Sequence, residues 1–422
     1  MHLGPRTPRT APFPLPASKS LANRALVIRA LSDAPVELAN AGDAEDVVTM
    51  QRLLARVADG ATLDCGPAGT TYRFLAAYLA TRPGTQTLTG SARMLERPVG
   101  PLVDALRHLG ADVAYLGREG YPPLRIGPAD GLASATAVAL PGDVSSQYLS
   151  ALLLVGPVLP HGLRLRWTGE LVSRPYLAMT AALMRHLGAQ LAVDYEAAEV
   201  VVEPGGYTGG AYAVEADWSA ASYAAAWCAL GGVGTEYTCP HLRDDSLQGD
   251  RQLTAWIAEW GVETAFDDAG ARFRKTADVT PDTFECDFET SPDLAQTFAF
   301  LCGATGVTGL FTGLQTLRIK ETDRIAALRD ELAKVGVSVS ELPGRFAPAS
   351  GRTYYLIEGR AAWGGAVRLA TYHDHRMAMA GSLLARHGAV EVEDPAVVGK
   401  SFPAFWEALD GATAPTAEMP AR

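Results

Sequence analysis

The chain has 422 residues, of which 48% are hydrophobic and 20% charged, and its formal net charge is −11. A chain of this length should form two or more domains, and its acidic balance argues against nucleic acid or an anionic membrane surface as a partner. The first residues lack the apolar segment of a signal peptide, and the longest apolar run, residues 149–159, contains Gly and Pro and is too short to span a bilayer. We therefore expect a cytoplasmic protein.

The cysteines and histidines favour neither disulfides nor a metal site. The five cysteines are scattered and never form a C-x-x-C pair, which fits a reduced compartment. His373 and His375 flank Asp374, but no third or fourth ligand lies nearby at metal-binding spacing. We expect no metal.

Six segments with apolar residues at helical spacing each run into a glycine, and an alternating, strand-like run follows in most copies. The six are residues 47–60, 102–110, 177–188, 253–261, 325–336 and 402–411. After the first interval the terminal glycines recur about every 75 residues, so the chain contains an internal repeat.

A second, Ala- and Leu-rich helix is predicted upstream of each of these. These helices begin near Ser18, Thr70, Ser145, Ser219, Ser291 and His373. Because they are apolar nearly all round, they should be buried, with the first set outside them. Each repeat then reads β-α-β-α-β-β. We predict an α/β (α+β) fold of two similar domains, residues 13–214 and 215–422, each with three repeats, with residues 1–12 able to pack with the second domain.

Polar residues gather where the buried helices begin. They are Lys19, Ser20, Asn23 and Arg24; residues 66–73; residues 143–147; Asp217 and Ser219; residues 291–293; and residues 373–376. Each Ser or Thr taken singly fits an ordinary helix cap. Buried helix starts, however, also offer free N–H groups and a positive dipole end, and three of these starts carry Lys or Arg as well. We infer that they converge on one interdomain cleft that holds small polyanions.

Residues 317–324 place three cations and two carboxylates directly before an apolar helix, with Thr322 or a neighbour as its cap. Lys320, Glu321 and Arg324 should face a common site; the alternative is a solvated, self-paired helix start. Arg and Lys suit phosphate and carboxylate ligands, while Glu321, Asp293 and Lys19 are candidates for general acid and base. No P-loop, dinucleotide-binding or Ser-hydrolase motif is present.

Nine short blocks resemble the signature blocks of the 5-enolpyruvylshikimate-3-phosphate synthase family, in the family's order. They are residues 15–24, 68–73, 96–98, 145–147, 173–176, 292–293, 320–324, 374–379 and 400–403. The resemblance implies transfer of the enolpyruvyl group of phosphoenolpyruvate to the 5-hydroxyl of shikimate 3-phosphate, with release of phosphate, in the pathway to chorismate and aromatic amino acids. It implies no metal or organic cofactor, and we expect a monomer. The family's two-domain repeat fold agrees with the one inferred above.

The resemblance also implies which residues bind each substrate. Those implied for shikimate 3-phosphate are Lys19, Ser20, Arg24, Ser145, Ser146, Gln147, Ser173, Tyr176, Asp293 and Lys320. Those implied for phosphoenolpyruvate are Lys19, the backbone of Gly69, Arg97, Gln147, Arg324, Arg376 and Lys400. Glu321 and Lys19 would carry protons, and Asp293 would partner the attacking hydroxyl.

The sequence departs from the family at two positions and leaves two alternatives open. Pro67 and Thr316 stand where members of the family carry Asn, and Pro67 can supply neither the side-chain bond nor a backbone N–H. The first alternative is the sister transferase acting on UDP-N-acetylglucosamine, which would want a reactive Cys in a mobile loop. Cys65 borders residues 66–70, but residues 80–125 contain no Cys. The second is a catalytically silent binding protein of the same fold.

Overall fold

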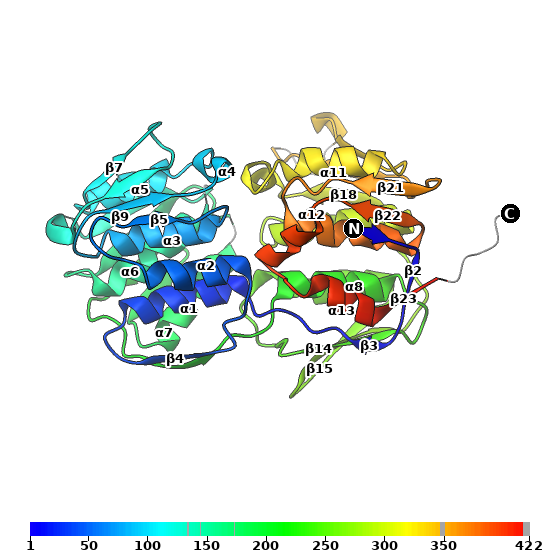
Figure 1. Cartoon of the computed structure of the whole chain (residues 1–422), viewed down its shortest axis with the longest axis horizontal. Helices are drawn as coiled ribbons and strands as arrows, with labels where there is room; N and C mark the ends of the chain where they lie inside the picture. The colour runs from blue at the N-terminus through cyan, green and yellow to red at the C-terminus, as the bar shows by residue number, and fades with distance from the viewer. Residues whose placement is uncertain (133–134, 144, 173, 347–350, 417–422) are drawn as a thin grey trace. The chain divides into compact units, whose positions relative to one another are not determined.

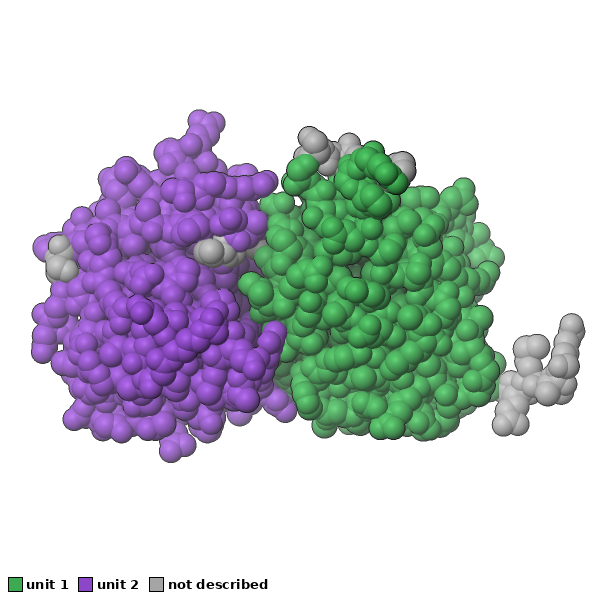
Figure 2. All heavy atoms as spheres, turned by 90° about the horizontal axis from the view of Figure 1, so that it is seen from above, with its two compact units in different colours: residues 1–16, 215–422 green, residues 17–214 purple. Residues whose placement is uncertain are grey.

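The computed structural model describes residues 1–132, 135–143, 145–172, 174–346 and 351–416. The chain divides into two compact units, which Figure 2 colours separately: unit 1 is Met1–Pro16 with Glu215–Arg422, and unit 2 is Ala17–Val214. The sequence-based division assigned residues 13–16 to the first domain, whereas here they belong to unit 1. The reason is local, because Phe13 is fully buried in the core of unit 1 and its N–H donates to the carbonyl of Thr238 at 2.8 Å.

Unit 2 has buried helices at its centre, with outer helices and sheets around them (Figure 1). The buried helices are α1 (Lys19–Leu31), α3 (Gly69–Leu79) and α6 (Ser146–Val155), and the outer ones are α2 (Glu45–Leu54), α5 (Gly100–His108) and α7 (Arg174–His186). One sheet has the order β5 (Thr62–Asp64), β6 (Gln86–Thr89), β8 (Leu124–Ile126), β7 (Val113–Tyr115). The second has the order β11 (Leu191–Asp194), β12 (Glu199–Val202), β10 (Leu163–Thr168), β9 (Ala137–Pro141), and a two-stranded sheet pairs β4 (Val36–Ala39) with β13 (Gly210–Ala213).

Unit 1 repeats this plan. Its buried helices are α8 (Trp218–Ala229), α10 (Ala295–Thr305) and α12 (His375–Gly381), and its outer helices are α9 (Leu253–Ile257), α11 (Arg324–Ala333) and α13 (Phe405–Ala412). Its four-stranded sheets have the orders β15 (Val262–Asp267), β16 (Gly270–Lys275), β14 (Glu236–Pro240), β3 (Ala11–Pro12) and β17 (Thr283–Asp287), β18 (Thr308–Thr312), β20 (Tyr355–Glu358), β19 (Ser338–Glu341). Smaller sheets join β1 (His2–Leu3), β22 (Ala389–Val392) and β21 (Ala366–Leu369), and β2 (Arg6–Pro8) with β23 (Thr413–Pro415).

The predicted α/β class and the β-α-β-α-β-β repeat are confirmed. One complete copy runs β5, α3, β6, α5, β7, β8 and the next runs β9, α6, β10, α7, β11, β12. In each copy the first two strands pair in parallel and the last two antiparallel. A strand exchange was not predicted. Strand β13 precedes α8 of unit 1 in the sequence but pairs with β4 in unit 2. Strand β3 precedes α1 of unit 2 but pairs with β14 in unit 1.

The helices expected to be buried are buried, because they carry apolar side chains on every face. Every residue of α8 is buried, and so are all residues of α10 before Thr305. Helix α10 begins at Ala295 rather than near Ser291, since residues Pro292–Leu294 form a separate 3₁₀ turn. None of the helices in the described part of the chain combines the length and apolarity needed to cross a membrane.

The starts of the buried helices differ in their capping. Side chains of Ser145, Asp217 and Asp374 accept hydrogen bonds from N–H groups at the starts of α6, α8 and α12. Helices α1 and α3 have no such side-chain cap. Side-chain capping therefore accounts for some of the polar starts but leaves the first N–H groups of α1 and α3 to other partners.

Candidate active site

Arg324 is the centre of a charged network in unit 1. It is only 1% exposed, and all of its donor nitrogens contact carboxylates. Nε donates to Asp374 Oδ2 at 2.7 Å, Nη1 to Asp293 Oδ1 at 2.9 Å and Nη2 to Glu321 Oε2 at 3.0 Å. Burial lowers the pKa of Arg324, but the carboxylates, led by Asp374, outweigh burial and raise that pKa above its ordinary value.

Glu321 joins this arginine to a buried lysine. Lys400 is 3% exposed, and its Nζ donates to Glu321 Oε1 at 2.8 Å. The two oxygens of one carboxylate therefore each contact a different cation. This arrangement places a carboxylate directly between two cations of the kind that suits the phosphate or carboxylate of a ligand.

Asp293 links the network to a second buried arginine. Its Oδ2 accepts from Arg376 Nη2 at 2.8 Å, while Oδ1 binds Arg324. Burial alone would raise the pKa of Asp293, but the neighbouring cations, led by Arg376 and followed by Lys320, hold that pKa well below its ordinary value. Asp293 is therefore an ionised hydrogen-bond acceptor at neutral pH.

Local structure explains how these side chains are presented. Asp323, next to the Thr322 favoured by the sequence, is the cap of α11: its Oδ1 accepts from the N–H groups of Ile325 and Ala326, both at 3.1 Å. Arg324 is thus the first residue of the helix. Asp374 caps α12 in the same way and accepts from the N–H of Arg376 at 2.9 Å, so one carboxylate both starts this helix and binds Arg324.

A further buried carboxyl group, that of Asp250, interacts electrostatically with Arg376. Asp250 is 4% exposed, and it accepts a short hydrogen bond from the hydroxyl of Ser219 on α8. Burial, together with repulsion from Asp293, raises the pKa of Asp250 to about 7. Tyr223 of α8 contacts Arg376 Nη1 at 3.5 Å, and burial raises the pKa of Tyr223 to about 12.

In unit 2 Arg24 is buried among neutral groups. Its Nε donates to Thr180 Oγ1 at 2.7 Å, Nη2 to Ser150 Oγ at 3.0 Å and Nη1 to the carbonyl of Ser20 at 2.8 Å. The guanidinium also lies 5.9 Å from the ring centre of Tyr176. Within the described residues no carboxylate forms an ion pair with Arg24, and burial lowers the pKa of Arg24 to about 10. It is therefore a charged donor at neutral pH.

The start of α3 brings two more arginines together. A Cβ built on Gly69 would lie 2.5 Å from Arg97 Nη1 and 2.7 Å from Arg73 Nη1, so both guanidinium groups crowd this first residue of the helix. Arg73 donates to the carbonyl of Gly69 at 3.0 Å, and it stacks on the ring of Tyr148 at 5.4 Å. An uncapped helix start between two arginines is a strongly anion-attracting position.

The remaining predicted residues of unit 2 lie at neighbouring helix starts. Lys19, the first residue of α1, forms an ion pair of 3.1 Å with the buried Asp46 on α2. Gln147 Nε2 donates to Thr70 Oγ1 at 3.0 Å. The other described calls, Ser20, Ser145, Ser146 and Tyr176, are half-buried. Ser173 lies outside the described residues.

The structure thus joins the predicted residues of unit 1 into one network, whereas those of unit 2 lie mainly around the starts of α1, α3 and α6. Unit 1 brings together Asp293, Glu321, Arg324, Arg376 and Lys400, with Lys320 close enough to act on the charge of Asp293. Sequence reasoning counted Asp374 and Arg73 among the polar helix starts but assigned neither to a substrate, and it did not name Asp46. In the structure Asp374 contacts Arg324, Arg73 contacts Gly69 and Asp46 contacts Lys19. Asp374 and Arg73 lie inside two of the nine family-like blocks, so the sequence could have identified them. No sequence signal marks Asp46.

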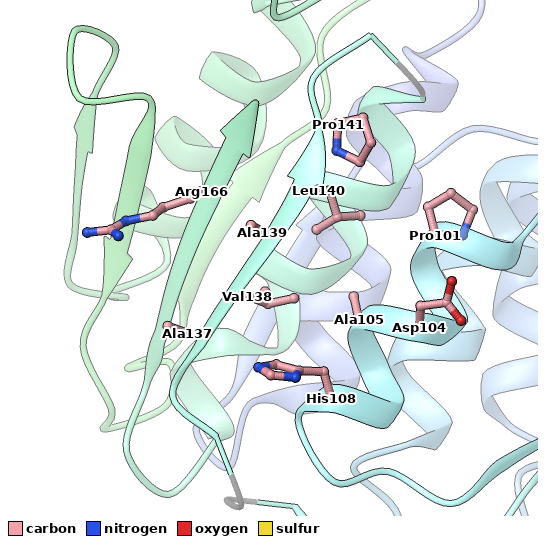
Figure 3. Close-up of a pocket in the computed structure, with 10 residues that line it drawn as sticks. All are labelled: Pro101, Asp104, Ala105, His108, Ala137, Val138, Ala139, Leu140, Pro141 and Arg166. Atoms are coloured by element: carbon pink, nitrogen blue, oxygen red, sulfur yellow. The ribbon is translucent and has the colours of Figure 1, made fainter. Parts of the chain in front are cut away.

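The described residues provide no metal site, and the groove beside α5 is not a second polar site. Among them no group of three His, Cys, Asp or Glu side chains is placed to hold a metal ion. A groove of about 610 Å³ lies between α5 and β9, and His108 of α5 points toward that strand (Figure 3). The groove is lined mainly by apolar residues, and none of the predicted site residues contributes to it.

Comparisons of the whole chain point to one family. The family model described as EPSP synthase (3-phosphoshikimate 1-carboxyvinyltransferase) matches residues 56–409. The chain is 41% identical over 402 residues to a 3-phosphoshikimate 1-carboxyvinyltransferase of Bacteroides fragilis, with 94% of each chain covered. It is 36% identical over 430 residues to the enzyme of that name from Bordetella parapertussis, again with 94% of each covered.

The fold is shared with solved structures. An EPSP synthase structure from Acinetobacter baumannii superposes with a TM-score of 0.77 at 19% identity, covering 97% of this chain and 98% of that chain. At this identity the superposition supports the two-domain α/β fold and carries no argument about individual residues.

Proposed function

The chain belongs to the EPSP synthase family, and on this premise we propose that it transfers the enolpyruvyl group of phosphoenolpyruvate to the 5-hydroxyl of shikimate 3-phosphate. The observation that carries the assignment of roles is the network in which Glu321 contacts both Arg324 and Lys400. It combines a carboxylate with two cations inside a buried cluster, which suits acid–base chemistry on an anionic substrate.

The reaction needs a proton to be added to phosphoenolpyruvate and then removed. As the 5-hydroxyl oxygen bonds to C2 it gives up its proton, which is balanced by the proton that the departing phosphate takes up, and C3 takes up a proton and becomes a methyl group. The C2–O bond to phosphate then breaks, and C3 returns a proton as the double bond re-forms. In our proposal Glu321 and Lys19 carry these protons, and Asp293 accepts the hydrogen bond of the attacking hydroxyl.

The ionisation of Asp293 supports its part in this proposal. Because its pKa is held well below the ordinary value, the carboxylate can accept a hydrogen bond from a hydroxyl at neutral pH without first losing a proton. Its two oxygens are held in place by Arg324 and Arg376. These bonds orient the carboxylate before a substrate binds.

Shikimate 3-phosphate is assigned mainly to the cations and hydroxyls of unit 2. Arg24 is the principal charged group, with Lys19 and the other described residues named above, and Asp293 and Lys320 complete the set. The buried charge of Arg24, which is paired only with neutral acceptors, supports this assignment because a phosphate dianion would supply the missing countercharge.

Phosphoenolpyruvate is assigned to the cations around the proton-carrying groups. The residues assigned to it are Arg324, Arg376 and Lys400 of unit 1 and Lys19, Gly69, Arg97 and Gln147 of unit 2. The carboxylates that already contact the unit 1 cations keep these side chains ordered in the absence of ligand. Pro67 replaces an amide in this set, so one side-chain hydrogen bond is lost from the subsite.

The sister transferase that acts on UDP-N-acetylglucosamine fits less well. Cys65 is the cysteine that borders residues 66–70, and it is 1% exposed. Burial raises the pKa of its thiol above the ordinary value, which disfavours the reactive thiolate. Our proposal further includes a monomeric, cytoplasmic enzyme whose two domains correspond to the two units.

Phosphate release tests the proposed function. The purified chain should release phosphate from phosphoenolpyruvate only when shikimate 3-phosphate is also present, and EDTA should leave the rate unchanged. Release that requires UDP-N-acetylglucosamine instead would assign the sister reaction. Binding of both substrates without release would assign a silent binding protein.

A further inference from the structure

The loop that leads into α12 contains an unusual turn. Tyr372 and His373 both have a φ of 54°, in the left-handed region that side chains other than Gly rarely occupy. The N–H of Asp374 donates to the carbonyl of Thr371 at 2.8 Å, so these two residues are the centre of a tight turn. Because left-handed backbone is unfavourable for both, contacts outside the turn must hold it.

Glu331 of α11 supplies such contacts. Its side chain is 1% exposed, and Oε1 accepts from the hydroxyl of Tyr372 at 2.7 Å. Oε2 accepts from the N–H of Ala370 at 3.0 Å and from Lys334 Nζ at 2.6 Å. Burial and the Glu331 hydrogen bond raise the pKa of Tyr372 above its ordinary value, so the phenol is a proton donor at neutral pH.

The same helix also holds the far side of the turn. Arg324 begins α11 and binds Asp374, and Glu331 lies seven residues further along, two helical turns away on the same face. One rigid helix therefore contacts Ala370 before the strained pair, Tyr372 within it and Asp374 directly after it. Asp374 and Arg376, which follow directly, take their positions from this turn.

We propose that Glu331 and Tyr372 are positioning residues for phosphoenolpyruvate: their hydrogen bond holds the turn that places Asp374 against Arg324 and Arg376 against Asp293. This inference rests on the proposed function, in which Arg324 and Arg376 bind that substrate. Within the described residues, neither Glu331 nor Tyr372 itself contacts a residue assigned to shikimate 3-phosphate, and the turn reaches that set only through Asp293. Loosening the turn should therefore affect phosphoenolpyruvate much more than shikimate 3-phosphate.

A conservative pair of variants separates positioning from stability. Tyr372→Phe removes only the hydroxyl that donates to Glu331. Tyr237→Phe is the matched control, since it removes a tyrosine hydroxyl in the same unit that donates to the carbonyl of Ala412 at 2.8 Å. We expect Tyr372→Phe to raise KM for phosphoenolpyruvate about 3- to 10-fold, the equivalent of one hydrogen bond, and to leave the Kd for shikimate 3-phosphate within about twofold. Tyr237→Phe should change neither value.

Glu331→Gln provides a second, independent variant. A carboxamide has one oxygen and cannot accept at both Tyr372 and Ala370, so KM for phosphoenolpyruvate should again rise, while thermal unfolding reports whether the variant is folded. If Tyr372→Phe has the same KM as wild type, or if Tyr237→Phe raises KM equally, the positioning role is wrong.

Arg376→Ala distinguishes failure of this inference from failure of the proposed function. If Arg376→Ala raises KM and Tyr372→Phe does not, the positioning inference alone fails. If Arg376→Ala leaves KM for phosphoenolpyruvate unchanged, the assignment of that substrate to Arg376 fails and the proposed function must be revised first.

Discussion

Two buried arginines, Arg324 in unit 1 and Arg24 in unit 2, lie in opposite electrostatic environments. In unit 1 Arg324 contacts three carboxylates, and their attraction raises the pKa of Arg324 above its ordinary value despite burial. In unit 2 Arg24 contacts two hydroxyls and a carbonyl, and burial lowers the pKa of Arg24 to about 10. The same side chain, similarly buried, is thus charge-compensated in one unit and left without a countercharge in the other.

This difference indicates what each set is built to do. A compensated cluster contains its own carboxylates, which are the groups needed for proton transfer, and its cations are ordered before any ligand arrives. An uncompensated arginine bears an unfavourable desolvation free energy that a bound phosphate would relieve. In our proposal the first set therefore contributes Glu321 to proton transfer, alongside Lys19 of unit 2, and the second set provides most of the groups that bind shikimate 3-phosphate.

The largest expected effect is on stability and compares the two arginines directly. Arg324→Met leaves Asp374, Asp293 and Glu321 without their shared partner, and should lower the free energy of unfolding by about 3–5 kcal/mol. Arg24→Met leaves only neutral acceptors, and Ser150 and Thr180 already contact each other at 3.0 Å, so its cost should be under about 1.5 kcal/mol. Urea unfolding of both variants measures the difference. Equal losses would show that the two environments are energetically alike.

The next effect is on turnover. Glu321→Gln keeps the shape of the side chain but cannot carry a proton, so kcat should fall by roughly 10² or more while shikimate 3-phosphate still binds. Glu341→Gln, an exposed change on β19, is the control and should leave kcat unchanged. A Glu321→Gln variant with near-normal kcat would return the unit 1 cluster to a purely structural role.

A smaller effect is expected at the start of α3. Gly69→Ala would place a Cβ against Arg97 and Arg73, displacing both guanidinium groups, and should raise KM for phosphoenolpyruvate about tenfold. Gly100→Ala is the control, because this glycine also begins a helix of unit 2 and its Cβ would meet no atom closer than 3.5 Å. If both variants keep the wild-type KM, Gly69 lies outside the subsite.

The pH dependence of stability tests the raised pKa of Asp250. Since the pKa of Asp250 is raised to about 7 in the folded state, this group binds a proton between about pH 4 and pH 7 that the unfolded chain has released. Its contribution to stability therefore decreases as pH rises through this range and is constant above it. Asp250→Asn should gain stability relative to wild type from pH 4 to pH 7, whereas the exposed Asp282→Asn should not. Parallel stability curves would contradict the raised pKa.

Much of the fold could be predicted because its signals are local. A glycine closely follows most of the outer helices, although Gly411 lies inside α13 and α2 ends well before Gly60. Runs of Ala and Leu mark the buried helices, so helix starts such as Gly69 and Ser146 lie within a residue of expectation. The exchange of β3 and β13 was not predictable, since strand pairing depends on partners far away in the sequence.

The candidate site was likewise predictable only in part. The cations and the two carboxylates Asp293 and Glu321 could be named from short blocks, but their pairing could not. Asp374 contacts Arg324 across 50 residues, Asp46 contacts Lys19 across 27, and Glu331 reaches Tyr372 across 41. Long-range side-chain contacts have no periodic signature in the sequence, and they are what separates the compensated cluster from the uncompensated one.

Calorimetric titration of shikimate 3-phosphate into two variants tests the division between the units most directly. Arg24→Met removes the uncompensated cation and should weaken binding about 10- to 100-fold, the range for a hydrogen bond to a charged group. Lys400→Met removes a compensated cation assigned to the other substrate and should leave the Kd within about threefold of wild type. Binding that is retained in Arg24→Met, or lost equally in Lys400→Met, would contradict the assignment of shikimate 3-phosphate to the uncompensated arginine of unit 2.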